Sequence, residues 1–392
     1  MDAGAAGSEG RRDDFLVFGQ PSIGEEEIAE VVATLRSGWI GKGPRVEKFE
    51  QLMVQYTGAG NAVATNSCTA ALHLSLLALG IGPGDEVITT PMTFVATANA
   101  IVHTGARPVF ADVSRDSMLI SPDSIERAIT PRTRAILPVH LAGRPCDLDA
   151  INGIAARHGI AVIEDAAHAI ESRYRGRAIG SIGDLTCFSF YATKNVTTSE
   201  GGMVTTNDPG LAKRIRTLSL HGMSADAYQR FGNSGYRHYE VEEPGYKYNM
   251  TDVQAAIGIH QLQRVECSLL RRNEIWEKYQ RSFSELPVEL PQQDDPQCRH
   301  ARHLYTIMVD PARCGRTRDE VLLALKEENI GCGVHYTALH LHSWYRKTFG
   351  FKEGDFPNAE WIGARTLSLP LSAKLSEYDV ESVASALRRV LS

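Results

Sequence analysis

A lysine in apolar company is the first residue of this 392-residue sequence that could do chemistry. Lys194 follows the apolar run Phe188–Phe190 and stands among small hydroxyl residues and aromatics rather than among charges. Burial of an ammonium lowers its pKa, and the free amine is a nucleophile that can form a Schiff base with an aldehyde. The alternative is a lysine whose stem is buried while its charge reaches water. Taken alone, Lys194 leaves both interpretations open.

Two acids end another apolar run. Glu164 and Asp165 follow Val162 and Ile163, at what we expect to be the carboxyl end of a buried strand. Ligands of open parallel sheets bind at that end. The two acids could instead cap the next segment, which is a common use of acids after strands.

Two further segments could hold parts of a ligand. Small polar residues at 66–69 open a helix, whose free backbone amides and positive dipole end suit a phosphate, although a plain helix cap needs no ligand. Phe94 comes directly after an expected strand and could stack on a planar ring, or belong to the core.

Together these four features match the requirements of pyridoxal 5′-phosphate (PLP). Lys194 would take the aldehyde, and the helix start at 66–69 would take the phosphate. Asp165 would keep the pyridine nitrogen protonated, so that the ring can accept electrons. At ~4 Å and an effective dielectric constant of 20, such an ion pair interacts by roughly 4 kcal/mol. The combination therefore predicts a PLP site.

The order of elements indicates how these residues are positioned. Between residues 86 and 218, short apolar runs alternate with helical segments, which predicts crossover connections and a mainly parallel sheet with helices on both faces. The expected strands are 86–90, 108–110, 134–139, 160–163, 185–190 and 202–205. The expected helices of this part include 24–38, whose apolar residues Ile28, Val31, Val32 and Leu35 share one face, and those starting near 66, 121, 148 and 211.

The character of the chain changes after residue 267. A charged helix at 262–283, a loop at 287–296, a strand at 304–309 and helices at 319–328 and 377–391 predict a smaller α+β unit. We therefore expect an α/β protein with a flexible arm at 1–17, a large PLP-binding domain at 18–265 and a small C-terminal domain at 266–392.

Composition argues against several classes of protein. The net charge of −6 speaks against a chain dominated by nucleic-acid or membrane binding, and no apolar run approaches the ~20 residues that a membrane span needs. The start of the chain has no apolar signal-peptide core, so we expect a cytoplasmic protein. The seven cysteines are scattered, which predicts neither a zinc site nor a disulfide scaffold, and we expect no metal.

Beyond these residues, the chain resembles the nucleotide-sugar aminotransferases of PLP-dependent fold type I from about Phe18 onward. The resemblance rests on the order of its motifs: Ser-Gly-Trp-Ile at 37–40, Asn-Ser-Cys-Thr at 66–69, Pro-Met-Thr-Phe at 91–94, Glu-Asp-Ala-Ala-His-Ala at 164–169, Lys-Asn at 194–195, Gly-Tyr-Lys-Tyr-Asn at 245–249 and Gly-Val-His-Tyr at 333–336. Within the family it looks most like the UDP-4-amino-4-deoxy-L-arabinose–oxoglutarate aminotransferases, because of the 164–169 and 245–249 motifs.

The resemblance implies roles for named residues. Lys194 would bind PLP covalently and then relay a proton between substrate and cofactor. The other expected cofactor contacts are Asp165 at the pyridine nitrogen, Phe94 on the ring face, His168 near the ring oxygen or the carboxylate, and Cys68, Thr69 and Ser189 at the phosphate.

The family also shares its sites across a homodimer. The segment 245–249 of one subunit reaches into the neighbouring site, and its third residue is often Asn in the family but is Lys247 here, with Asn249 two positions on. We expect Lys247 to bind phosphate. Trp39, Lys42, His335 and Tyr336 fall where the family lines its sugar pocket, although a packing role suits each as well.

The implied reaction takes the amino group from L-glutamate, releasing 2-oxoglutarate, and gives it to a UDP- or TDP-linked 4-keto sugar. A 4-keto pentose is the first expectation, and a dTDP-4-keto-6-deoxyhexose or a 3-keto sugar is the alternative. A family dehydratase would carry histidine in place of Lys194. A PLP-binding regulatory protein would carry an added DNA-binding domain, for which the residues before Phe18 are too few.

Overall fold

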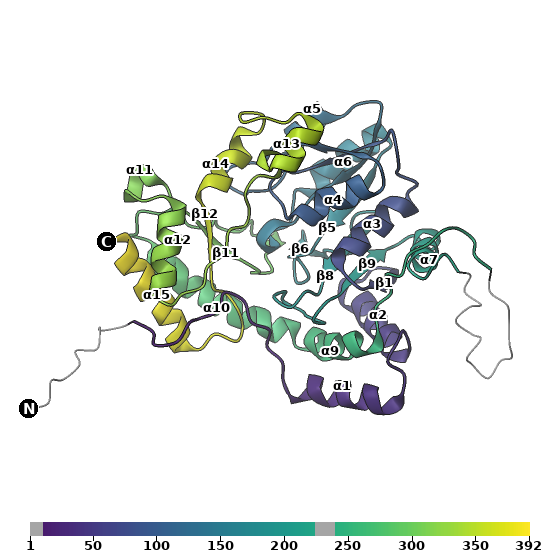
Figure 1. Cartoon of the computed structure of the whole chain (residues 1–392), viewed down its shortest axis with the longest axis horizontal. Helices are drawn as coiled ribbons and strands as arrows, with labels where there is room; N and C mark the ends of the chain where they lie inside the picture. Colours follow the sequence, from purple (N-terminus) through teal and green to yellow (C-terminus); the bar gives the residue numbers. More distant parts are fainter. Residues whose placement is uncertain (1–10, 224–239) are drawn as a thin grey trace, which may run out of the picture.

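A seven-stranded sheet forms the centre of the protein, for which a computed structural model describes residues 11–223 and 240–392 (Figure 1). The strand order is β1-β9-β8-β5-β4-β2-β3, and β9 alone in this sheet runs opposite to its two neighbours. The strands are β1 (Asn61–Thr65), β2 (Glu86–Thr89), β3 (Arg107–Phe110), β4 (Thr133–Leu137), β5 (Ala161–Asp165), β8 (Leu185–Ser189) and β9 (Gly202–Thr206). The predicted α/β fold with a mainly parallel sheet is therefore confirmed.

Helices cover both faces of this sheet. Successive residues of one strand point to opposite faces, so Val87 belongs to one buried cluster and Ile88 to another. This two-sided burial explains why the strands read as continuous apolar runs. The helices are α2 (Pro44–Thr57), α3 (Cys68–Ala78), α4 (Val95–His103), α5 (Pro122–Ala128), α6 (Leu148–His158), α7 (Pro209–Leu218) and α9 (Asp252–Gln263).

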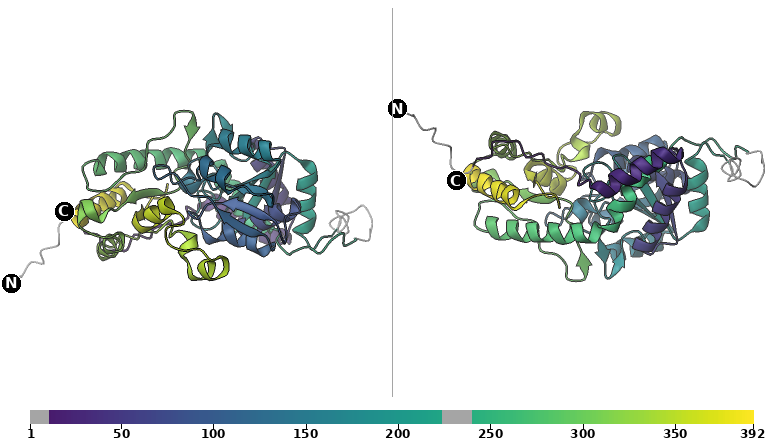
Figure 2. Two further views of the ribbon diagram at one scale, coloured as in Figure 1. Left: turned by 90° about the horizontal axis from the view of Figure 1, so that it is seen from above. Right: turned by 90° about the horizontal axis from the view of Figure 1, so that it is seen from below.

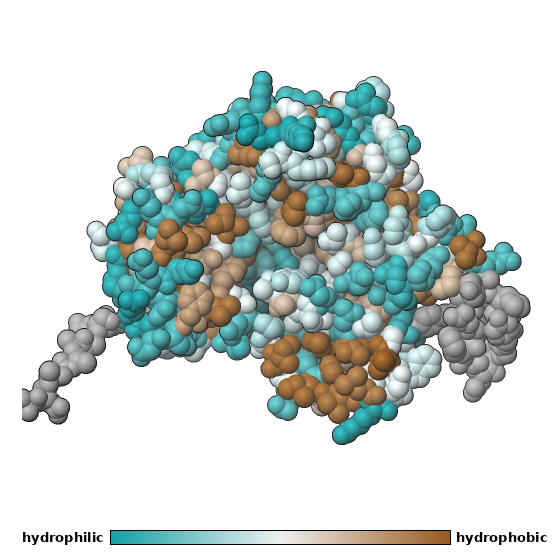
Figure 3. All heavy atoms as spheres, in the orientation of Figure 1, coloured by the Kyte–Doolittle hydropathy of each residue, from teal (hydrophilic) through white to brown (hydrophobic). Residues whose placement is uncertain are grey.

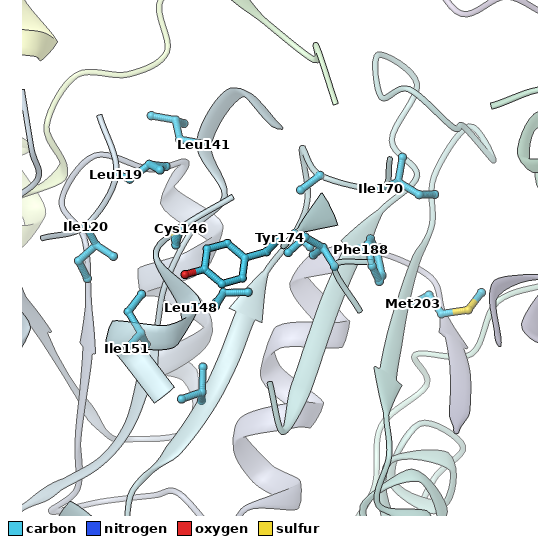
Figure 4. Packing of buried hydrophobic residues seen from close by; sticks show 14 of the residues in the cluster. Leu119, Ile120, Leu141, Cys146, Leu148, Ile151, Ile170, Tyr174, Phe188 and Met203 are labelled. Carbon is cyan, nitrogen blue, oxygen red and sulfur yellow. The ribbon is translucent and has the colours of Figure 1, made fainter. Parts of the chain in front are cut away.

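Figure 4 shows the larger of the two clusters that flank the sheet. Phe188 and Met203 reach it from neighbouring strands, and Leu148 and Ile151 reach it from α6. On the opposite face, α3 packs against β8 and β9. The ends of β5 and β8 are thus held between two layers of helix, which fixes where Asp165 and Ser189 lie.

A second core forms around the two antiparallel strands β11 (Tyr305–Met308) and β12 (Thr366–Leu369). The other elements of the C-terminal part are α10 (Val265–Phe283), α11 (Pro311–Cys314), α12 (Arg318–Glu327), α13 (Ser343–Phe349), α14 (Pro357–Arg365), α15 (Glu377–Leu391), the short strand β10 (Cys298–Arg299) and the single turn η2 (Leu339–Leu341). The strand β10 pairs with β6 (Arg173–Tyr174), which lies beside β7 (Arg177–Ala178), and the single turn η1 (Leu141–Gly143) stands between β4 and α6. Ala338, Ala359 and Ile362 join the core of the large sheet instead. The division at residue 265 stays a prediction.

The beginning of the chain lies against this second core. Arg12 forms an ion pair with Asp379 of α15, and the backbone of Leu16 bonds to Asn329 and Gly331. Residues 11–17, which we expected to belong to a flexible arm, are therefore bound to the C-terminal part. Residues 1–10 of that predicted arm lie outside the described residues.

Three features differ from the sequence-based expectation. Several elements were not predicted, among them the helices α2, α13 and α14 and the strands β1 and β12. The helix expected at 262–283 is α10, which begins only at Val265, because α9 ends at Gln263 and Arg264 separates the two helices. The third concerns α1 (Glu25–Ser37), which packs on α9 at the edge of the molecule (Figure 2) while its apolar residues Ile28 and Leu35 remain exposed.

None of the described helices combines the length and the apolar character that crossing a bilayer needs.

Candidate active site

A cavity of about 400 Å³ opens where β5 and β8 end and where α3 and α4 begin. Nine of the residues singled out from the sequence line it: Cys68, Thr69, Phe94, Asp165, His168, Ser189, Lys194, His335 and Tyr336. The strand-end argument thus brought together residues that are far apart in the chain. In the described part of the chain, no group of three or more His, Cys, Asp or Glu side chains could hold a metal ion.

Lys194 lies in the loop between β8 and β9. Its backbone N–H donates to the Tyr191 carbonyl at 2.9 Å, so a tight turn presents the side chain to the cavity. Burial lowers the pKa of Lys194 to about 8, and the charges of Cys68 and Asp165 oppose that shift without cancelling it. An amine with this pKa is partly unprotonated near neutral pH, as a nucleophile or base requires.

Asp165 is the last residue of β5 and is 5% exposed. Its Oδ2 accepts the Thr97 hydroxyl at 2.8 Å, and its Oδ1 accepts the backbone N–H of Ala167 at 3.1 Å. Burial raises the pKa of Asp165, while these two donors and the charge of Lys194 lower it. The carboxylate is therefore held in one orientation and is suited to a cationic N–H group in the cavity.

The start of α3 offers backbone donors to the cavity. Ser67 caps the helix by accepting the N–H of Ala70 at 3.1 Å, and Cys68 and Thr69 form its first turn. Gly202 of β9 passes directly beneath: a Cβ at this position would lie 2.5 Å from the Ser67 carbonyl carbon and 2.6 Å from the Cys68 nitrogen. Only glycine allows this approach, and a helix start that lines the cavity suits a phosphate.

Aromatic rings and His168 form another wall of the cavity. Phe94, at the start of α4, is 57% exposed, and its ring centroid lies 6.0 Å from that of Tyr336. The Nδ1 atom of His168 accepts the backbone N–H of Ala142 at 3.2 Å, and its Nε2 lies 3.4 Å from the Tyr336 hydroxyl. Both ring nitrogens of His168 thus face partners other than Asp165, and the role of His168 toward the cofactor stays a prediction.

Glu164, the other acid of this strand end, faces away from the cavity. Its carboxylate accepts the Gly183 N–H at 2.7 Å and the Thr186 hydroxyl at 3.0 Å, and lies 2.8 Å from His140 Nε2. Glu164 and His140 are fully buried. This acid therefore has a structural role, although the contacts are not those of a cap on the segment that follows β5.

Four predicted residues lie outside the cavity of their own chain. Lys247 is exposed, and Asn249 donates to the carbonyl of its neighbour Met250 at 3.1 Å. Trp39 is 49% exposed, and burial lowers the pKa of Lys42, with the charge of Lys247 among the nearby causes. Since 245–249 was expected to serve a neighbouring subunit, the roles of these residues stay predictions.

The structure adds cavity residues that were not singled out before. Thr97 orients Asp165, and Thr93 bonds to Thr97 at 2.8 Å between their hydroxyl oxygens. Their spacing of four residues was a usable signal, since it brings the two hydroxyls together around the start of α4. Tyr191 and Glu200 also line the cavity, and nothing in their local sequence distinguished them.

The donor set fits PLP. Lys194 offers an amine, Asp165 an oriented carboxylate and Phe94 a ring face, and the start of α3 offers amides that a Cβ at Gly202 would displace. Each of these matches one part of the cofactor.

Comparisons with known proteins point in the same direction. The model of the DegT/DnrJ/EryC1/StrS aminotransferase family matches residues 21–388. The chain is 53% identical over 382 residues to the spore coat polysaccharide biosynthesis protein SpsC of Bacillus subtilis, covering 97% of this chain and 98% of that one. Among solved structures, the putative sugar aminotransferase Spr1654 from Streptococcus pneumoniae in its PMP form superposes with a TM-score of 0.89 at 37% identity, over 96% of this chain and 100% of that one. Helicobacter pylori PseC, an aminotransferase involved in the biosynthesis of pseudaminic acid, superposes with a TM-score of 0.88 at 28% identity, over 97% and 99% of the two chains.

Proposed function

Because the chain belongs to the DegT/DnrJ/EryC1/StrS aminotransferase family, whose members are PLP-dependent sugar aminotransferases, we propose that it transfers the amino group of L-glutamate to a nucleotide-linked 4-keto sugar. The predicted cofactor is confirmed at the level of the family. For the acceptor we propose a 4-keto pentose, supported by the Gly-Tyr-Lys-Tyr-Asn form of residues 245–249. The names of SpsC and PseC support a sugar substrate without specifying this one.

The observation that carries the proposal is the position of Lys194. Its amine lies in the same cavity as Asp165, with a pKa lowered by burial to about 8. When bound, PLP carries the amino group between donor and acceptor and spreads the electron pair of the carbon that loses its proton. Lys194 Nζ would hold the cofactor covalently and, once released, would take that proton and return it at the other carbon bonded to the transferred nitrogen. Proton transfer by a positioned amine contributes roughly 10²–10⁴-fold.

The other cavity residues would bind and orient the cofactor. Asp165, fixed by Thr97 and Ala167, would keep the heterocyclic nitrogen protonated. The amides of Cys68 and Thr69 would bind the phosphate, with Ser189 as a further donor. Phe94 would cover the ring and reduce its contact with water.

We also propose a homodimer. Six large apolar side chains at 23–40 are exposed by 37% to 56%: Ile23, Ile28, Val32, Leu35, Trp39 and Ile40. Figure 3 shows the resulting brown surface over α1, hereafter the α1 patch. Monomeric proteins rarely expose so many apolar residues together. A second copy on the α1 patch would bury it. Lys42 follows the patch in the chain, and Lys247 is near enough to Lys42 to affect its pKa, which supports a position of both lysines at the subunit contact.

A panel of keto-sugar nucleotides tests the acceptor. The purified protein is incubated with PLP and L-glutamate and, in separate reactions, with a UDP-4-keto pentose, a dTDP-4-keto-6-deoxyhexose or a 3-keto sugar nucleotide. The products are identified by mass spectrometry. We expect an aminated product and 2-oxoglutarate in equal amounts, with the pentose used best. Turnover of 4-keto-6-deoxyhexoses alone would replace the pentose proposal.

A second experiment tests whether Lys194 is the residue that binds PLP. Borohydride reduction of the PLP-loaded protein followed by peptide mapping should place the cofactor on Lys194, and Lys194→Met should remain unlabelled. Labelling of another lysine would refute the assignment.

A further inference from the structure

Asn195, the neighbour of Lys194, has a side chain whose orientation the structure dictates. Its Nδ2 atom lies 2.8 Å from Glu171 Oε2 and 2.9 Å from the Ala301 carbonyl oxygen. A carboxylate and a carbonyl can only accept, so the atom facing both must be the amide nitrogen. The Asn195 Oδ1 atom therefore points the other way, toward His303.

This orientation fixes the proton on His303. The Asn195 Oδ1 and His303 Nδ1 atoms lie 3.0 Å apart, and an amide oxygen can only accept, so Nδ1 carries the proton. His303 is 8% exposed, and burial together with the charge of Lys194 lowers its pKa well below the ordinary value. The ring is therefore neutral and has its lone pair on Nε2.

His168 carries its proton on the opposite nitrogen. A backbone N–H, that of Ala142, donates to His168 Nδ1, which leaves the proton on Nε2, facing the Tyr336 hydroxyl. The centroids of the His168 and His303 rings lie 4.3 Å apart, with 34° between the planes. Two neutral imidazoles with opposite tautomers thus lie against each other beside the lysine.

An ion pair anchors this arrangement. Glu171 and Arg272 of α10 form a salt bridge in which both side chains are almost fully buried. The remaining Glu171 oxygen receives Asn195, and Ala301 accepts from both Asn195 and Arg272. The loop that holds Lys194 is thereby tied to α10 and to the 301–303 segment.

We propose that Asn195 is a positioning residue for Lys194, which holds the lysine loop against residues 301–303 and fixes His303 as the Nδ1–H tautomer packed against His168. The inference rests on the proposed function of Lys194, because a lysine side chain that must reach two atoms in turn needs a backbone that is held in place. Asn195 itself does not line the cavity, so its effect passes through its neighbours.

Histidine tautomers provide the first test, which is independent of turnover. The PLP-loaded protein is labelled with ¹⁵N-histidine, and the His303 and His168 signals are assigned from their loss in His303→Gln and His168→Gln. We expect protonated Nδ1 in His303 and protonated Nε2 in His168. A His303 ring protonated on Nε2 in the unchanged protein would overturn the proposal, whether or not any Asn195 variant folds.

Variants provide the second test. Asn195→Leu should lose the His303 tautomer and lower kcat about 10- to 100-fold, with KM for the sugar nucleotide within threefold, since small misplacements of a catalytic group have effects of this size. Asn195→Asp keeps the oxygen that faces His303 Nδ1 but puts a carboxylate oxygen against Glu171 Oε2 and the Ala301 carbonyl, so it should lower kcat as well. Unchanged kcat in folded Asn195→Leu would overturn the proposal.

A matched control separates positioning from general loss of an amide contact. Asn358 donates its side-chain Nδ2 to the Val113 carbonyl at 2.8 Å and does not line the cavity, so Asn358→Leu should leave kcat and the tautomer unchanged. An equal loss of kcat in both leucine variants would overturn the specific role of Asn195. Failure of the proposed function is visible separately, as absence of borohydride labelling at Lys194 in the unchanged protein.

Discussion

Replacement of Lys194 by methionine should stabilise the cofactor-free protein at neutral pH while abolishing activity. Methionine has a similar length and no charge, and the native site disfavours the ammonium form. The pKa of Lys194 falls from the ordinary 10.5 to about 8, which corresponds to roughly 3 kcal/mol at 1.36 kcal/mol for each tenfold change in proton affinity. We expect a gain of about 2–3 kcal/mol in the free energy of unfolding at pH 7.

The sign of the pH dependence follows from linkage. Between pH 8 and 10.5 the unfolded chain binds a proton at Lys194 that the folded chain does not, so the stability of the unchanged protein rises with pH in this window. The gain of Lys194→Met should therefore be full below pH 8 and vanish near pH 10.5. Urea unfolding of the two proteins, freed of PLP, measures the difference, and the exposed Lys352→Met is the control. Equal stability at pH 7, or a gain that persists unchanged at pH 10.5, refutes the reasoning.

Three other predictions follow from the site and the surface. Asp165→Asn removes an ion pair of up to roughly 4 kcal/mol with the cofactor, so kcat should fall at least about 100-fold in the coupled assay; a loss under tenfold contradicts the assigned role. Gly202→Ala should weaken PLP binding at least about tenfold in a fluorescence titration, because its Cβ collides with the backbone at the start of α3, whereas Gly153→Ala on α6 should leave binding unchanged. Val32→Asp on the α1 patch should yield a monomer in analytical ultracentrifugation, and Leu323→Asp, at a more exposed apolar site on α12, should not; an unchanged mass for Val32→Asp argues against this interface.

The central residues of the cavity could be predicted because a rule of topology connects them. Asp165 and Ser189 end adjacent strands of a parallel sheet, and such ends meet at one edge whatever the intervening sequence. Lys194 follows the second of these strands within a few residues, so its position was constrained as well. The apolar runs that reveal such strands are visible in one sequence, because burial on both faces leaves no room for polar alternation.

Other features depend on contacts that no local pattern records. The apolar residues of α1 have the period of a helix that packs on a core, yet Ile28 and Leu35 are exposed. Periodicity shows that a helix has an apolar face, but it does not show which surface covers that face. The orientation of Asn195 depends on Glu171 and Ala301, which lie 24 and 106 positions away in the chain. Such polar networks become visible only in three dimensions.

The reversed direction of β9 has a consequence for how this site could change over time. Since β9 returns beside β8 with no helix between them, Lys194 occupies a closed hairpin whose two stems are bonded to each other, from Ser189↔Gly202 onward. Any added or deleted residue there would move the amine relative to both stems at once. Insertions in the crossover segments elsewhere in the sheet would not displace the amine in this way. We therefore expect changes in substrate specificity to arise in those segments, while the length of the lysine hairpin stays constant.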